Sequence, residues 1–379
     1  MAGCYAEGAG FLADPGSDPR DGALSGSADD GVLALPDLAS RALRGSVVAA
    51  SDEFFAEKEN LITPTPPSFT PGSYGHKGQL YDGWETRRRR GQGGGLPAPD
   101  EHDWVIVRLG APTMVHAVVV DTAYFTGNFP QSCAVEACYL DGYPAAAGLA
   151  AARWVPIVPR SPLKGDTPHV FEVPPRHRYS HVRLRIYPDG GVARLRVHGR
   201  VVPDPRLLDG LTFDLAAVEN GGDIEACSDR FYSAPRNVIS PGLSRVMGEG
   251  WETRRRREPG NEWLTVRFAA AATVRLAEID TSGYIGNSPG IALLRGRDSA
   301  ADATAGTAAA DAGSWSGLLP RTALQPDTPH RFRIAEPRAV DLVRLDVFPD
   351  GGVARLRLYG SLAPQAMAQV RRRWDETAP

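Results

Sequence analysis

Cysteine and long apolar runs are both scarce in this sequence. Only four of its 379 residues are cysteine, at positions 4, 133, 138 and 227, and no two form a CxxC pair. This spacing argues against a zinc ribbon or a disulfide framework and favours a reducing compartment. No run approaches the roughly 18 apolar residues of a membrane helix, and the first residues lack a basic segment followed by an apolar one. We therefore expect a cytoplasmic protein with no membrane partner.

Neither sign of charge is in excess. The 42 basic and 45 acidic residues give a net charge of -3, so no overall field would hold a nucleic acid. Hydrophobic residues make up 42% and charged residues 23% of the chain, as in an ordinary folded globular protein. Motifs typical of zinc proteases, serine hydrolases and nucleotide-binding proteins are also missing.

The most informative feature is an internal repeat. The octapeptide Gly-Trp-Glu-Thr-Arg-Arg-Arg-Arg occurs twice, ending at Arg90 and at Arg257. Other segments match in the same order: residues 51–55 with 228–232, 60–62 with 237–239, 121–130 with 280–289, and 188–196 with 349–357. These matches predict two tandem copies of one domain, at residues 35–200 and 208–362, joined by a linker at 201–207. We expect residues 1–34 to be disordered and residues 363–379 to form a tail with a short helix.

Within each copy, hydrophobic residues alternate with polar ones. Val182, Leu184 and Ile186 follow a period of two, which predicts a strand covered on one face. Similar runs, separated by turn residues, occur at 104–109, 115–120, 134–139, 154–158 and 193–198. About seven such strands per copy, without a long helical period, predict an all-β fold made of two antiparallel β-sandwiches.

The repeated arginine run is the outstanding polar motif. A single run usually marks a solvated face or a nucleic-acid patch, but this one recurs behind a tryptophan that would anchor it to the core. In an extended segment Arg87 and Arg89 face away from Arg88 and Arg90. At least one of these pairs should therefore meet carboxylates, either internal or external. The planar guanidinium group is well suited to a small carboxylate ligand.

Other polar residues have two interpretations. Arg194 and Arg196 lie on one strand face, where they could bind a carboxylate ligand or pair with Asp189 at the neighbouring turn. Asp121 and Asn128 could act in a site or form turns at a strand end. Asp121 or Asp189 could also offer oxygen ligands to a divalent ion, but no spacing here is diagnostic of a metal site. We expect no cofactor.

Together these motifs resemble the allantoicase family over nearly the whole chain. The resemblance rests on residues 37–40, 52–55, 83–90, 102–104, 121–130, 135–137 and 188–191. It implies two jelly-roll sandwiches of the galactose-binding-like type and a hydrolase that acts on linear amidine-type C–N bonds. The reaction would convert the small molecule allantoate and water to ureidoglycolate and urea, in purine degradation through allantoin. Open strand edges favour self-association into a homo-oligomer.

The implied reaction suggests roles for individual residues. Losing one ureido arm as urea requires protonation of a poor leaving nitrogen, and the water that replaces it requires a base. Our catalytic candidates are the carboxyl groups of Glu85, Glu136, Asp121 and Asp189. The substrate-binding candidates are three carboxylate clamps and one ureido partner: Arg87, Arg89, Arg194 and Asn128. Because Glu136 aligns with Arg295 and His102 with Asn261, we expect a site dominated by the first copy.

Two other classes of protein compete with this reading. Tandem jelly rolls also occur as non-catalytic carbohydrate-binding proteins, which expose a flat platform of Trp or Tyr and need no buried carboxyl pair. A nucleic-acid binder would carry a continuous basic stripe with exposed aromatic residues, and the net charge of -3 weighs against it. An enzyme would instead show a concave pocket lined by arginine and carboxyl groups.

Overall fold

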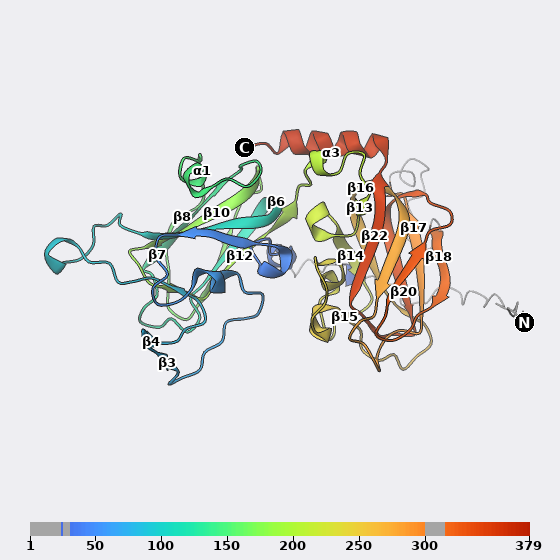
Figure 1. Ribbon diagram of the computed structural model, residues 1–379, viewed down its shortest axis with the longest axis horizontal. Coiled ribbons are helices and arrows are strands. Elements are labelled where there is room, and N and C mark those ends of the chain that lie inside the picture. The colour runs from blue at the N-terminus through green and yellow to red at the C-terminus, as the bar shows by residue number, and fades with distance from the viewer. Residues whose placement is uncertain (1–23, 26–30, 300–314) are drawn as a thin grey trace, which may run out of the picture.

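The computed structural model describes residues 24–25, 31–299 and 315–379. The segment that we expect to be disordered, residues 1–34, lies outside this part of the chain apart from 24–25 and 31–34. Two β-rich units lie side by side, and a C-terminal helix lies over one end of the second unit, with its last turn reaching the first (Figure 1). The predicted all-β class and the tandem arrangement are thus confirmed.

The first unit is built on a seven-stranded antiparallel sheet. Its strands are β2 (Ser46–Ala50), β6 (Asp103–Asp121), β7 (Ser132–Cys138), β8 (Val155–Pro162), β9 (Pro168–Glu172), β10 (Arg178–Tyr187) and β12 (Arg194–Val201). The long strand β6 pairs with β2 and β10 along its first half and with β9 and β12 along its second half. It therefore belongs to both layers of the sandwich. Smaller pairs are β3 (Tyr74–Gly75) with β4 (Gly78–Gln79) and β5 (Trp84–Glu85) with β11 (Gly191–Val192).

The second unit repeats this pairing. Its strands are β13 (Phe213–Asp214), β14 (Asp223–Cys227), β15 (Trp251–Glu252), β16 (Glu262–Asp280), β17 (Ile291–Arg297), β18 (Ser316–Ala323), β19 (Pro329–Arg333), β20 (Ala339–Phe348), β21 (Gly352–Val353) and β22 (Arg355–Leu362). Strand β16 takes the place of β6, pairing first with β14 and β20 and then with β19 and β22. The short strand β1 (Leu24–Ser25) pairs with β14.

Short helices occupy the connections. They are the 3-10 helices η1 (Val32–Ala34), η2 (Arg41–Leu43), η3 (Lys58–Ile62), η4 (Gln92–Gly94), η5 (Pro205–Leu207), η6 (Val218–Asn220), η7 (Pro235–Ile239) and η8 (Met247–Glu249), and the α-helix α1 (Ala146–Ala150). None of the helices in the described ranges is long and apolar enough to cross a membrane.

The hydrophobic alternation places the core as predicted. Val182, Leu184 and Ile186 are fully buried on β10, and burying side chains of this size contributes about 1.5–3 kcal/mol each. One prediction was wrong: the strands expected at 104–109 and 115–120 are the single strand β6. The chain stays extended between them because Gly110 N–H donates to Leu38 O (2.9 Å) and Val202 N–H to Pro112 O (2.8 Å). The strand changes partners there instead of ending.

A buried tryptophan in each repeat and a tight glycine turn fix the strand ends near the candidate site. Trp84 and Trp251 are both fully buried, which confirms their predicted anchoring role. Their indole N–H groups donate to Asp52 O (2.7 Å) and Asp229 O (2.9 Å). In the Pro-Asp-Gly-Gly turn, Gly190 has a φ of 137°, and a Cβ there would lie 2.6 Å from Asn128 O. Only glycine permits this close approach.

The helix α3 (Pro364–Glu376) joins the two units. Its Met367 and Val370 are buried in a small cluster with Leu208 and Ala270. Its far end contacts the first unit, where Arg178 N–H donates to Thr377 O (2.8 Å). The Arg178 guanidinium also lies 3.7 Å from the ring centre of Trp374. Contacts at both ends thus hold the two units in one arrangement.

Candidate functional site

The first and third arginines of the repeated run are held by carboxylates of the same chain. Arg87 Nε donates to Asp52 Oδ2 at 2.7 Å, and Arg89 Nη2 donates to Asp103 Oδ1 at 2.6 Å. The bond to Asp103 raises the pKa of the Arg89 guanidinium, so its charge is secure. Asp103 is nearly fully buried and also accepts from Ser51 Oγ at 2.8 Å. The prediction that one pair of arginines meets carboxylates is confirmed, and these carboxylates are internal.

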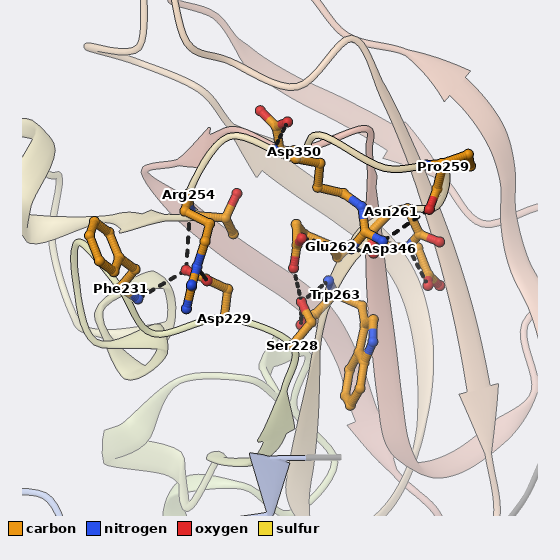
Figure 2. Close-up of polar contacts among 12 residues, drawn as sticks. Ser228, Asp229, Phe231, Arg254, Pro259, Asn261, Glu262, Trp263, Asp346 and Asp350 are labelled. Carbon is orange, nitrogen blue, oxygen red and sulfur yellow. Dashed lines mark hydrogen bonds and ion pairs between the residues drawn. The ribbon is translucent and has the colours of Figure 1, made fainter. Parts of the chain in front are cut away.

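The second repeat has the same arrangement. Figure 2 shows Arg254 beside Asp229, whose carboxylate also accepts from the backbone N–H of Phe231. Arg256 donates to Glu262 Oε1 at 2.7 Å, in the place of the Arg89–Asp103 pair. Ser228 then bonds to Glu262 as Ser51 does to Asp103 (Figure 2). Glu262 is longer than Asp103 by one methylene, yet it bonds to the arginine and the serine in the same way.

The other two arginines face a hollow. Arg88 and Arg90 are exposed and make no ion pair with any residue that the structure describes. They line a depression of about 190 Å³ with Arg89, Gly95, Leu96, Pro97, Phe129, Gln131, Pro188 and Asp189. Sequence reasoning had assigned the clamp to Arg87 and Arg89. Arg88, Arg89 and Arg90 all line this hollow, so alternation along the run does not decide which arginines are available; the ion pairs of Arg87 and Arg89 do.

Glu85 and Asn128 are brought together from positions 43 residues apart. Asn128 Nδ2 donates to Glu85 Oε1 at 2.7 Å, and no cation within the described residues pairs with this carboxyl group. Burial raises the pKa of Glu85 above its ordinary value, and the hydrogen bond from Asn128 opposes only part of that effect. Neither side chain lines the hollow itself, but both residues neighbour residues that do: Asn128 precedes Phe129 in the chain, and Glu85 pairs with Gly191, two residues after Asp189.

Asp189 lies in the hollow, whereas Asp121 lies in a turn. Asp189 Oδ2 accepts from the backbone N–H of Arg89 at 2.7 Å, which brings it close to the arginine run. Asp121 ends β6 and accepts from Ala123 N–H at 2.9 Å. That bond is the turn-forming alternative for Asp121. The structure therefore groups Asp189 with the arginines but gives Asp121 a local partner.

Arg194 is almost completely buried and fully occupied. It donates to Asp82 Oδ2 at 2.8 Å and to the backbone oxygens of Thr65, Pro66, Asp82 and Ala193. Arg196 pairs with Asp37 at 3.4 Å. The alternative to ligand binding was an ion pair with Asp189. Both arginines instead pair with aspartates from loops that are distant in sequence. A substrate-binding role for Arg194 stays a prediction that this geometry does not favour.

Glu136 belongs to a cross-strand ion pair. Its carboxylate lies 2.5 Å from Arg183 Nη2 and 3.0 Å from Arg185 Nη2, both on the neighbouring strand β10. In the second repeat the charges are exchanged: Arg295 replaces Glu136, and Asp346 replaces Arg185. The new pair joins Arg295 Nη2 and Asp346 Oδ2 at 2.9 Å. This exchange indicates that Glu136 stabilises the sheet face, and its predicted catalytic role stays untested.

Exposed aromatic residues flank the Glu85 strand. Phe54 and Phe55 meet edge to face, with ring centres 5.1 Å apart and an interplanar angle of 87°. Phe55 N–H donates to Glu85 O at 3.2 Å, which ties this pair to the site. Rings at right angles do not form the flat platform expected of a carbohydrate-binding module.

The cysteines and potential metal ligands that the structure describes form neither a reactive thiol site nor a metal cluster. Cys133, Cys138 and Cys227 are buried and unpaired, and Cys4 lies outside the described residues. Burial raises the pKa of Cys133 and Cys138 to about 12, so neither is a reactive thiolate. In the part of the chain that the structure describes, no three His, Cys, Asp or Glu side chains gather closely enough to hold a metal ion.

Fold and site together define a protein of two tandem β-sandwiches with an arginine frame and a carboxyl–amide pair at matching strand ends. A family model described as the allantoicase repeat matches residues 36–202 and 213–363. A probable allantoicase of Nocardia farcinica is 53% identical over 88% of this chain and 96% of its own length. One from Streptomyces avermitilis is 46% identical over 96% and 93%. The crystal structure of allantoicase from Saccharomyces cerevisiae superposes with a TM-score of 0.70, at 31% identity, over 88% of this chain and 98% of its own. The chain belongs to the allantoicase family.

Proposed function

We propose that this protein hydrolyses allantoate to ureidoglycolate and urea, as a hydrolase of purine degradation. The observation that carries the proposal is the Glu85–Asn128 pair, a carboxyl group without a cationic partner beside a hollow lined by arginines. Allantoate has one carboxylate and two ureido arms on a single carbon. Arginines suit the carboxylate, and an amide suits the donors and acceptor of a ureido group.

The first step is the loss of one ureido arm. Protonated Glu85 gives its proton to the nitrogen of that arm while the C–N bond breaks, and the bonding electrons stay on this nitrogen. The nitrogen of the remaining arm keeps its hydrogen and supplies the electron pair for a new C=N bond, so neutral urea leaves and an iminium cation remains. The raised pKa of Glu85 suits this role, because more of the carboxyl group holds its proton near neutral pH.

The second step is the addition of water to the iminium carbon, as the C=N electron pair returns to nitrogen and makes it neutral. The Asp189 carboxylate accepts a proton from the water as its oxygen bonds to carbon, which yields ureidoglycolate. Exchange with solvent returns one proton to Glu85 and removes one from Asp189. Asp189 is suited to this role because its Oδ1 has no partner among the residues the structure describes, while Oδ2 is held by Arg89 N–H.

Arg88 and Arg90 bind the substrate carboxylate in this proposal. They line the hollow and form no ion pair within the described chain, so their guanidinium groups are available to a ligand. Arg89 adds to the positive charge, while Asp103 fixes its direction. Arg87 serves as the contrasting case, since its guanidinium is already bound to Asp52.

The test is a direct product assay. Purified protein incubated with allantoate should release one urea and one ureidoglycolate per substrate, with no nucleotide. Arg88→Ala and Arg90→Ala should each raise KM by about tenfold, as the loss of a charged hydrogen bond predicts, while Arg87→Ala should raise it less. No urea under reducing, neutral conditions, with or without divalent metal, would refute the proposal. A larger effect of Arg87→Ala would return the clamp to the arginines expected from sequence.

Location and assembly follow as further parts of the proposal. Buried cysteines without disulfides support a reducing, cytoplasmic setting. The edge strands β8 and β18 support self-association into a homo-oligomer. The near balance of charge supports a small-molecule substrate over a nucleic-acid partner.

A further inference from the structure

The second repeat holds a carboxyl–amide pair of the same kind. Asn287 Nδ2 donates to Glu252 Oε1 at 2.6 Å, and the Glu252 N–H donates to Ser233 Oγ at 2.9 Å. No cation among the described residues pairs with the Glu252 carboxyl group. Among the described residues, this carboxyl group is hydrogen-bonded only to the Asn287 amide, and a single hydrogen bond contributes only about 0.5–1.5 kcal/mol net to stability. Stability therefore does not explain why both repeats keep this pair.

The surroundings of the pair are duplicated as well. Phe231 and Tyr232 meet edge to face at 4.8 Å, as Phe54 and Phe55 do, and both are 62% exposed. The Arg254 guanidinium lies 5.1 Å from the Phe231 ring centre. Arg255 and Arg257, the counterparts of Arg88 and Arg90, are exposed and make no ion pair within the described ranges. Cations, amide, carboxyl group and aromatic pair therefore recur together.

The walls of the hollow are what the second repeat lacks. In the first repeat, Leu96 and Pro97 come from a Gly- and Pro-rich loop, and Phe129 adds a third wall. The second repeat passes from Arg257 to Glu262 with only four residues between, and Ser288 replaces Phe129. A small ligand bound there would stay open to water, so a proton donor would act in a poorly enclosed place.

We propose that the second repeat carries a second binding site, built on Glu252, Asn287 and the arginines 255 and 257. Its ligand class is a small carboxylate bearing a ureido group, the chemistry shared by the substrate and product of the proposed reaction, on which this inference rests. Glu252 accepts ureido N–H groups, Asn287 offers its amide oxygen, and the arginines bind the carboxylate. The site binds without efficient turnover because it lacks the enclosing loop.

The test counts ligands per chain with a probe that cannot lose urea by this route. N-carbamoylglycine has one carboxylate and one ureido arm, but no second nitrogen on the carbon between them. Calorimetric titration of the full chain should give two sites. Glu252→Ala combined with Asn287→Ala should leave one site, and so should the matched pair Glu85→Ala with Asn128→Ala. Glu249→Gln, which alters a nearby exposed ion pair with Arg245, is the control and should keep two.

A second variant tests the inference in case the first one fails to fold. Arg255→Ala with Arg257→Ala changes only exposed side chains, so it should keep the thermal midpoint and still weaken one of the two sites by at least tenfold. One site or none in the unmodified chain, or two sites that survive both second-repeat variants, would overturn the inference. Urea release with a single site would refute this inference alone. Two sites without urea release would refute the proposed function alone.

Discussion

Replacing Glu85 by glutamine removes the titrating group but keeps the size and shape of the side chain. Gln keeps the volume and still accepts the 2.7 Å hydrogen bond from Asn128 Nδ2, so folding and substrate position should change little. What disappears is the titrating proton. Positioned acid catalysis contributes about 10² to 10⁴ in rate, which corresponds to roughly 3–5 kcal/mol of activation free energy. We expect kcat for urea release to fall on the order of 10²-fold or more, with a smaller change in KM.

The matched change is Glu252→Gln, which removes the equivalent proton from the second repeat. Because that repeat lacks the enclosing loop, kcat should fall by less than about threefold. Initial rates of urea release, measured on variants whose thermal unfolding matches the unmodified protein, make the comparison. Similar losses for both variants, with both folded, would refute the bias toward the first repeat and leave the allantoicase activity intact.

The pH dependence gives this prediction a second readout. Burial raises the pKa of Glu85, so the acid form persists to higher pH than for an ordinary glutamate, and the rate should fall as pH rises through that pKa. Glu85→Gln should lose this limb. A raised pKa in the folded state also means that ionisation of Glu85 weakens folding as pH rises. The glutamine variant should therefore be at least as stable at neutral pH, and a marked loss of stability would contradict the reasoning.

Three other changes test the surrounding structure. Asp103→Asn should raise KM about tenfold by freeing the arginine it holds, and Asp103→Glu, which copies Glu262 of the second repeat, should recover most of the affinity; equal KM values for all three proteins would refute this positioning role. Glu136→Arg and Arg185→Asp should each lower the free energy of unfolding by about 1–3 kcal/mol. In denaturant titration, the double variant should recover at least half of the lost free energy of unfolding, and its kcat should be preserved. Loss of kcat in a stable double variant would instead make Glu136 catalytic. Trp374→Ala should cost about 3–5 kcal/mol in the same titration, and a loss below 1 kcal/mol would show that the helix does not hold the two units together.

Much of the fold could be predicted because its signals are local. The period of two along 182–186 reports which face of a strand is covered, and the recurrence of the octapeptide reports that the same domain occurs twice. The sequence also predicted that alternate arginines face opposite ways; the ion pairs of Arg87 and Arg89 follow that alternation, but Arg88, Arg89 and Arg90 all line one hollow. It did not reveal that β6 runs through Pro112, because the bonds that keep that segment extended come from Leu38 and Val202.

The site was predictable in its residue types but not in its partners. From the sequence alone, Glu85, Asn128 and Asp189 could be singled out, and the family could be named. Only the tertiary structure decided that Arg194 meets Asp82, and that Asn128 reaches Glu85. The physical reason is that a hydrogen bond between residues tens of positions apart depends on strand register and loop path. Those are set by the packing of the whole sandwich and not by the residues next to each partner.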